Sequence, residues 1–181
     1  MKIRDIGDIL GLALAGLLLL IPAARAAAGE GPAPDVPQLK VLDAWVGTWD
    51  FVFDSDPAKF QSEAVHATGT ETARWTLKGR FLERTTDSVQ GESRMLQTYD
   101  PGKRAYRSWF FNSSGITTES LDDWDATSRT MTHKHVGLGG RLTATATTRF
   151  LDADHIAWDQ VIKDESGTVV VRQRARWTRR K

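Results

Sequence analysis

The sequence predicts an all-β protein, a closed antiparallel up-and-down barrel of about ten strands with a short N-terminal capping helix. From residue 48 to the C-terminus, short runs of β-branched and aromatic residues alternate between apolar and polar. Turn residues separate these runs at short intervals, and short connections make neighbouring strands antiparallel. An even number of strands lets the last strand pair with the first, which removes the exposed edges of an open sheet.

The N-terminus has the layout of a secretory signal peptide. Lys2 and Arg4 precede an unbroken apolar run at 9–21, and a proline and small residues suited to signal peptidase follow it. The run is shorter than the roughly 20 apolar residues that span a bilayer, which favours a cleaved signal over a membrane anchor. We therefore expect residues 1–26 to be a signal peptide, and the mature protein to be secreted or periplasmic without stable membrane insertion.

Composition bounds the chemistry of the remaining chain. Residues 27–37 are rich in alanine, glycine and proline, which predicts a disordered leader before a barrel domain at 38–181. The chain contains no cysteine, so disulfides, thiolate metal sites and cysteine nucleophiles are excluded. Formal net charge is +1, and removal of residues 1–26 leaves a neutral chain. A neutral domain has no electrostatic reason to bind nucleic acid.

Local spacing assigns the elements. Leu39, Leu42 and Trp45 recur at three-residue steps, which predicts the buried face of a short helix just before the first strand. Turns such as Lys78-Gly79 and Gln90-Gly91 place glycine where a tight reversal requires positive φ. The expected strands cover 48–53, 64–77, 80–89, 94–99, 105–112, 116–124, 130–136, 141–151, 155–163 and 168–179.

An internal cavity follows from the expected strand number. A barrel of about ten strands tends to be wider than its own side chains can fill. Small residues on an inward face, such as Ala144 and Ala146, would help to leave space. Alternation and aromatic content predict the side chains that contact a ligand in this space. They are Trp75, Phe81, Glu83, Phe110 and Trp158.

Several segments together resemble a known family. Gly47-Thr48-Trp49 resembles the Gly-x-Trp signature of lipocalins and their calycin relatives. The ordered set is similar to the DUF1579 family of bacterial lipocalin-like proteins, and the resemblance covers about residues 39–181. The matching pieces are LDAWVGTWDF from Leu42, Gly69-Thr70-Glu71, WTLKGRFL from Trp75, Tyr99-Asp100-Pro101 and Arg176-Trp177-Thr178-Arg179. The resemblance implies a ten-stranded calycin-type barrel and no settled activity.

The resemblance also implies how the barrel closes. In lipocalins the signature tryptophan closes the barrel floor under an arginine from a late strand. We therefore expect Arg179 to pack over Trp49, with Arg176 as the alternative. A ligand would then enter from the opposite, open end of the barrel.

One acidic residue is a candidate for chemistry. Glu83 shares strand parity with Phe81, so we expect both to point into the interior. An acidic group in an apolar pocket must be paired or must have an altered pKa. Glu83 could therefore orient a ligand or take part in catalysis.

Two histidines and two aspartates are interpreted more conservatively. His133 and His135 share one strand face, which is a possible metal geometry, but only Met131 shares their parity and a solvated face is favoured. Asp122 and Asp123 are adjacent in a strand, so they point to opposite faces and cannot act as one pair. We assign no catalytic residue, no metal and no cofactor, haem included.

The sequence favours a binding protein over an enzyme. The leading hypothesis is a secreted or periplasmic barrel that binds a small hydrophobic or amphipathic ligand in its interior. One alternative is a protein-interaction or assembly module that uses an exposed aromatic face around Trp109 and Phe111. The other alternative is a barrel hydrolase or isomerase that uses Glu83. Oligomeric state has no signature in the sequence.

Overall fold

The computed structural model describes residues 31–60, 62–136 and 141–181. One 3-10 helix is followed by ten strands, and the strands close into an antiparallel barrel. The predicted signal peptide and the start of the leader lie outside the described residues. In the described part of the chain, no helix is long and apolar enough to cross a membrane.

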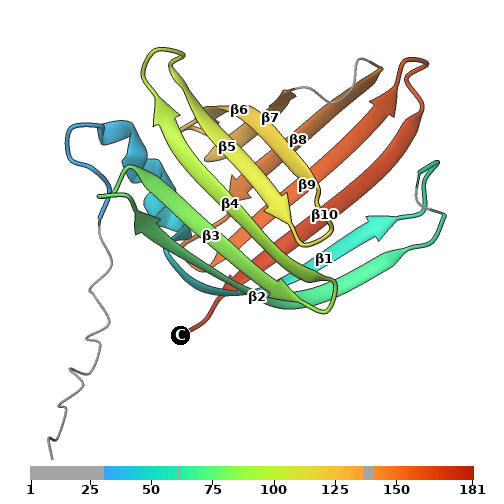
Figure 1. The fold of residues 1–181 in the computed structure, drawn as a ribbon, viewed down its shortest axis with the longest axis horizontal. Coiled ribbons are helices and arrows are strands. Elements are labelled where there is room, and N and C mark those ends of the chain that lie inside the picture. The colour runs from blue at the N-terminus through green and yellow to red at the C-terminus, as the bar shows by residue number, and fades with distance from the viewer. Residues whose placement is uncertain (1–30, 61, 137–140) are drawn as a thin grey trace, which may run out of the picture.

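The predicted fold class is confirmed. Each strand pairs with its neighbours in sequence, and β1 also pairs with β10. Figure 1 shows the helix at one end of the strands, where β1 begins, while β1 ends at the other end. The elements are η1 (Pro37–Trp45), β1 (Gly47–Asp56), β2 (Val65–Thr76), β3 (Phe81–Ser88), β4 (Gly91–Asp100), β5 (Ala105–Asn112), β6 (Thr117–Asp125), β7 (Thr130–Val136), β8 (Leu142–Phe150), β9 (His155–Asp164) and β10 (Val169–Arg179).

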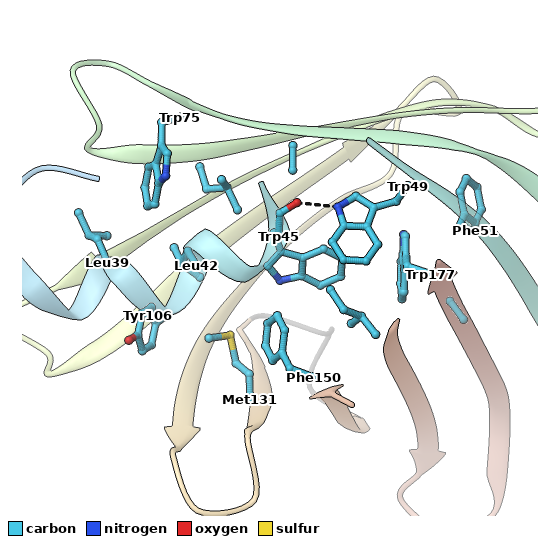
Figure 2. Packing of buried hydrophobic residues seen from close by; sticks show 14 of the residues in the cluster. Leu39, Leu42, Trp45, Trp49, Phe51, Trp75, Tyr106, Met131, Phe150 and Trp177 are labelled. Carbon is cyan, nitrogen blue, oxygen red and sulfur yellow. Dashed lines mark hydrogen bonds between the residues drawn. The ribbon is translucent and has the colours of Figure 1, made fainter. Parts of the chain in front are cut away.

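The helix η1 closes one end of the barrel. In a 3-10 helix, residues three apart lie above one another, so the three-residue spacing of Leu39, Leu42 and Trp45 puts all three on one face. All three are buried. Trp45 meets the rings of Trp49 and Trp177 edge-on, with centroid distances of 6.1 and 5.2 Å (Figure 2). The apolar core therefore lies at the closed end.

The packed domain begins earlier than the composition indicated. Ala33 is buried, and its backbone N–H donates to the carbonyl of Gly79 at 2.9 Å. Asp35 forms an ion pair with Arg80 at 2.7 Å. The expectation of disorder up to residue 37 is therefore wrong for residues 31–36, which pack on the turn between β2 and β3. Composition alone missed this contact because it depends on a turn more than 40 residues away, as the separation of Asp35 and Arg80 shows.

The barrel closes through Trp49 and Arg179. These residues are partners in the β1–β10 register, and the Arg179 guanidinium lies 4.0 Å from the centre of the Trp49 ring. The guanidinium also donates to the carbonyls of Val46 at 2.5 Å and Ala44 at 2.9 Å. A Cβ on Gly47 would lie 2.7 Å from Nη1 of Arg179, and its φ is +130°. Glycine therefore suits this position because it adopts the positive φ without strain and leaves space for the arginine.

Candidate functional site

A cavity of about 690 Å³ lies between the closed end and the loops at the opposite end. Every strand of the barrel contributes side chains to its wall. At the mouth, the lining includes Gln90 and Gly91 of the β3–β4 turn and Ser114 and Ile116 of the β5–β6 turn. The cavity therefore opens at the end away from η1, as the closure by Trp49 led us to expect.

Part of the wall is apolar. Phe51, Phe53, Phe110, Trp158 and Ile162 all line the cavity. The structure therefore places two of the predicted ligand contacts, Phe110 and Trp158, on the cavity wall. Large rings of this kind supply much of the apolar area that a bound molecule can cover.

A buried ion pair lies at the floor of the cavity. Nε and Nη2 of Arg84 donate to the two carboxylate oxygens of Glu71 at 2.7 and 3.0 Å, and Thr86 donates to Glu71 Oε2 at 3.1 Å. The guanidinium also stacks on the Trp45 ring, 3.4 Å from its centre. Two buried charges persist when each is paired and hydrogen-bonded, and these contacts satisfy both.

A second polar group, here called the polar belt, runs across five neighbouring strands from β4 to β8. It consists of Gln97, Ser108, Asp122, His133 and Thr148. Gln97 Nε2 donates to Ser108 Oγ at 3.1 Å, and Ser108 Oγ donates to Asp122 Oδ2 at 2.5 Å. His133 Nδ1 lies 3.0 Å from Asp122 Oδ1, and His133 Nε2 lies 2.8 Å from Thr148 Oγ1. Ser108, His133 and Thr148 also line the cavity.

Asp122 is charged although it is fully buried. Burial alone would raise the pKa of Asp122, but hydrogen bonds from His133, Ser108 and Ser120 and the attraction of His133 together lower this pKa. The carboxylate is therefore ionised at neutral pH and can only accept hydrogen bonds.

His135 lies beside the belt and also lines the cavity. Gln160 Nε2 lies 2.9 Å from His135 Nε2, so the amide donates and this ring nitrogen accepts. Burial lowers the pKa of His135, and the neighbouring His133 lowers it further, which keeps the ring neutral at pH 7. The ring proton is then on Nδ1, a buried atom without a hydrogen-bond partner among the described residues. Trp177 Nε1, also on the lining, is a second such donor.

Glu83 and Phe81 lie outside the barrel, so the prediction that they point inward is wrong. Oε2 of Glu83 accepts from Arg74 at 3.1 Å, and its other oxygen lies 3.5 Å from Arg94. Phe81 packs against Trp109 with a centroid distance of 6.3 Å. Each face of β3 carries one large apolar residue, Phe81 or Leu82, so alternation left two choices. Pairing of β3 with β2 directs Leu82, Arg84 and Thr86 inward instead.

Trp75 packs in the core at the closed end and does not line the cavity. It is buried next to η1, and its Nε1 donates to Asp43 at 2.7 Å. This hydrogen bond ties β2 to the capping helix at the closed end. The expected contact between Trp75 and a ligand therefore has no counterpart on the cavity wall.

His133 and His135 face the interior, so the interpretation of a solvated strand face is wrong. Polar residues on neighbouring strands surround them, and only the register of β6, β7 and β8 brings these residues together. Among the described residues, no three His, Asp or Glu side chains converge in a way that could hold a metal ion. The remaining polar residues of the interior escaped sequence analysis because a lone serine or glutamine carries no local signal.

The outer aromatic surface is partly packed. Trp109 lies between Phe81 and the Arg107 guanidinium, which is 4.7 Å from the centre of its ring. Phe111 is 42% exposed. A role of this surface in protein interaction stays a prediction.

Comparison with known proteins agrees with the fold. The family described as "Protein of unknown function (DUF1579)" matches residues 36–179. No curated protein matches the chain. Among solved structures, Rv2717c from M. tuberculosis is 13% identical with a TM-score of 0.58, and the match covers 81% of this chain and 99% of that one.

Two further solved structures share this architecture. The S-type phycobiliprotein lyase CPES from Guillardia theta is 11% identical with a TM-score of 0.50, covering 78% of this chain and 92% of that one. A DUF3598 protein of unknown function from Nostoc punctiforme is 10% identical with a TM-score of 0.50, covering 77% of this chain and 49% of that one. At such low identity the likeness shows the fold alone.

Proposed function

This chain belongs to the DUF1579 family of proteins of unknown function, and we propose that its barrel binds a small amphipathic molecule in the interior. The observation that carries the proposal is the cavity of about 690 Å³, which combines an aromatic wall with a polar belt. Small-molecule sites occupy about 300–1,000 Å³ and join apolar walls to a few placed polar groups. The predicted export of the protein is part of this proposal.

The mouth of the cavity supports entry of an apolar molecule. Phe60 in the β1–β2 connection, Val89 in the β3–β4 turn and Ile116 in the β5–β6 turn are 60%, 83% and 54% exposed. These connections all belong to the open end of the barrel. Exposed apolar side chains at a cavity mouth give an amphiphile a surface to contact before it enters.

The enzyme alternative requires the Glu83 carboxylate to lie inside the cavity. Glu83 is held on the outer surface by Arg74 and Arg94, with no access to the cavity from that face. The interior instead contains two acidic residues that already have partners: Glu71 is hydrogen-bonded to Arg84, and Asp122 lies 3.0 Å from His133. Buried polar groups of this kind suit recognition of a ligand that has a polar head group.

A matched pair of variants tests the proposal. Ala67 lines the cavity, whereas Thr68, the next residue of β2, is exposed on the outer face. We expect the neutral dye Nile red to bind the wild type with enhanced, blue-shifted fluorescence. Ala67→Phe fills the cavity and should weaken binding about tenfold or more, which corresponds to about 1.4 kcal/mol.

Thr68→Phe adds the same ring outside the barrel and serves as the control. It should bind Nile red within about twofold of the wild type, a difference smaller than about 0.5 kcal/mol. Thermal melts of both variants verify that each is folded. The proposal is refuted if the wild type does not bind the dye, or if folded Ala67→Phe binds it as well as Thr68→Phe does.

A further inference from the structure

The described residues that line the cavity supply no free positive charge. Among the described residues that line it, Arg84 is the only lysine or arginine. Both arms of its guanidinium fork are taken by Glu71, and one face of the group is covered by Trp45. The positive charge of Arg84 is therefore balanced by Glu71. Its remaining donor nitrogen, Nη1, lies 3.6 Å from the sulfur of Met95.

The histidines do not add a positive charge either. His133 Nδ1 lies 3.0 Å from the Asp122 carboxylate, so a positive charge on the ring would be balanced by that carboxylate. His135 is neutral at pH 7 because burial and the nearby His133 lower its pKa. Glu92 contributes a further negative charge near the mouth. The described lining of the cavity is thus neutral or negative.

A carboxylate would be poorly accommodated in such an interior. It would lose its hydration without gaining a cation, and burial of an unpaired charge is strongly unfavourable. An uncharged oxygen has no such cost. It can accept a hydrogen bond from His135 Nδ1 or Trp177 Nε1, the two buried donors that line the cavity without a partner in the described structure.

We infer that the barrel selects amphiphiles with an uncharged, oxygen-containing head group, such as an alcohol or an ester, and discriminates against carboxylates of the same chain length. The inference rests on the proposed binding function and specifies its ligand class. The apolar chain lies along the aromatic wall, and the head-group oxygen accepts a hydrogen bond from an interior donor. Discrimination arises from the pairing of Arg84 with Glu71.

Displacement of Nile red by decanol, methyl decanoate and decanoate at pH 8 tests the wild type. Decanol and the methyl ester should displace the dye at concentrations about tenfold lower than decanoate does, a ratio equivalent to about 1.4 kcal/mol. Equal potency of decanoate, or no displacement by any of the three, overturns the inference while the bound dye still supports the proposed function. Absence of dye binding rejects the proposed function itself.

A charge variant separates this inference from general preference for apolar molecules. Glu71→Gln removes the partner of Arg84 and leaves its positive charge available inside the cavity. We expect the potency of decanoate to rise about tenfold relative to that of decanol. Any apolar pocket would prefer decanol to decanoate, but only a pocket limited by the Glu71–Arg84 pair would gain decanoate binding on this change.

Two more variants complete the experiment. Glu83→Gln changes an acidic residue that also contacts arginines, but on the outer face, and it should alter neither potency. Gln173→Lys adds a cation to the cavity lining without removing a buried charge, and it should likewise favour decanoate if Glu71→Gln fails to fold. The inference is wrong if a folded Glu71→Gln protein, or in its place Gln173→Lys, shows no gain for decanoate.

Discussion

At the scale of single residues, Asp122 shows how a charge persists in a barrel interior. It is fully buried, and Ser108, Ser120 and His133 surround its carboxylate. Burial opposes the charge, but the neighbouring donors outweigh burial and lower the pKa of Asp122. A folded-state pKa below the unfolded value of about 3.9 means that ionised Asp122 stabilises the fold above that pH.

The pH dependence of this stabilisation has a definite sign. The contribution of Asp122 is present above pH 4 or so and is lost as the pH falls through the lower folded-state pKa. Asp122→Asn should therefore be destabilised by about 3 kcal/mol at pH 7, because it leaves His133 without its carboxylate. The difference from the wild type should shrink steadily below about pH 4. Urea unfolding at a series of pH values measures both effects.

The adjacent aspartate provides the control for this prediction. Asp123 points outward, is exposed and pairs with Lys134. Asp123→Asn should cost less than about 1 kcal/mol at any pH, as exposed ion pairs do. A difference between wild type and Asp122→Asn that stays constant from pH 7 to pH 3 would show that the carboxylate is not the source of the stability.

At the scale of elements, the β2–β3 turn connects the barrel to the segment before η1. Leu77, Lys78 and Gly79 all have positive φ, and the Gly79 carbonyl accepts the backbone N–H of Ala33. A Cβ on Gly79 would lie 2.1 Å from the Gly31 carbonyl oxygen. Glycine at this position therefore serves two purposes: it adopts the required backbone conformation, and it lets residues 31–36 approach the turn.

Two glycine variants separate these purposes. Gly115 has φ of +81°, close to the +76° of Gly79, but no atom lies within 4 Å of the position that its Cβ would take. Gly115→Ala should cost about 1–2 kcal/mol from backbone strain alone. Gly79→Ala should lower the free energy of unfolding by at least about 1 kcal/mol more than Gly115→Ala does, because the 31–36 segment must also move. Urea unfolding compares the two variants.

Hydrogen exchange offers a second measurement for the same pair. The Ala33 amide should exchange faster in Gly79→Ala than in Gly115→Ala, because only the first substitution displaces its acceptor. Equal losses of stability together with unchanged exchange at Ala33 would contradict the argument.

At the scale of the whole molecule, the pairing of β1 with β10 turns a meander into a barrel. Trp49 and Arg179 lie opposite each other in that pairing, and Trp45 covers Trp49 from the helix side (Figure 2). Trp49 is fully buried, and its Nε1 donates to the Trp45 carbonyl at 2.6 Å. Trp45 at this closed end also stacks against the Arg84 guanidinium of the Glu71–Arg84 pair.

Trp49→Ala should therefore weaken the whole barrel. Removal of a fully buried aromatic side chain costs about 3–5 kcal/mol in the free energy of unfolding. For a domain of this size the melting temperature should fall by about 10 °C. Trp109→Ala, on the outer surface, is the matched control and should cause a clearly smaller shift. A melting temperature unaffected by Trp49→Ala would eliminate its role in closure.

Much of the architecture was predictable because its signals are local. Alternation and glycine-containing turns predicted ten strands, and the three-residue spacing of Leu39, Leu42 and Trp45 predicted the buried face of η1. The position of Arg179 over Trp49 came from family resemblance and the even strand number. Alternation, turn residues and helix spacing are each set within one element, and the Trp49–Arg179 contact follows from pairing of the first strand with the last.

The sequence by itself determined the strand number, the closed barrel and the capping helix, because backbone periodicity and turn chemistry are encoded over a few residues. Tertiary structure alone decided which face of β3 and of β7 is inward, since each face of either strand carries a single large apolar residue and is otherwise polar. It moved Glu83 to the surface and brought Asp122 and His133 together. A one-residue change of register exchanges the two faces of a strand, and only pairing with neighbours sets that register.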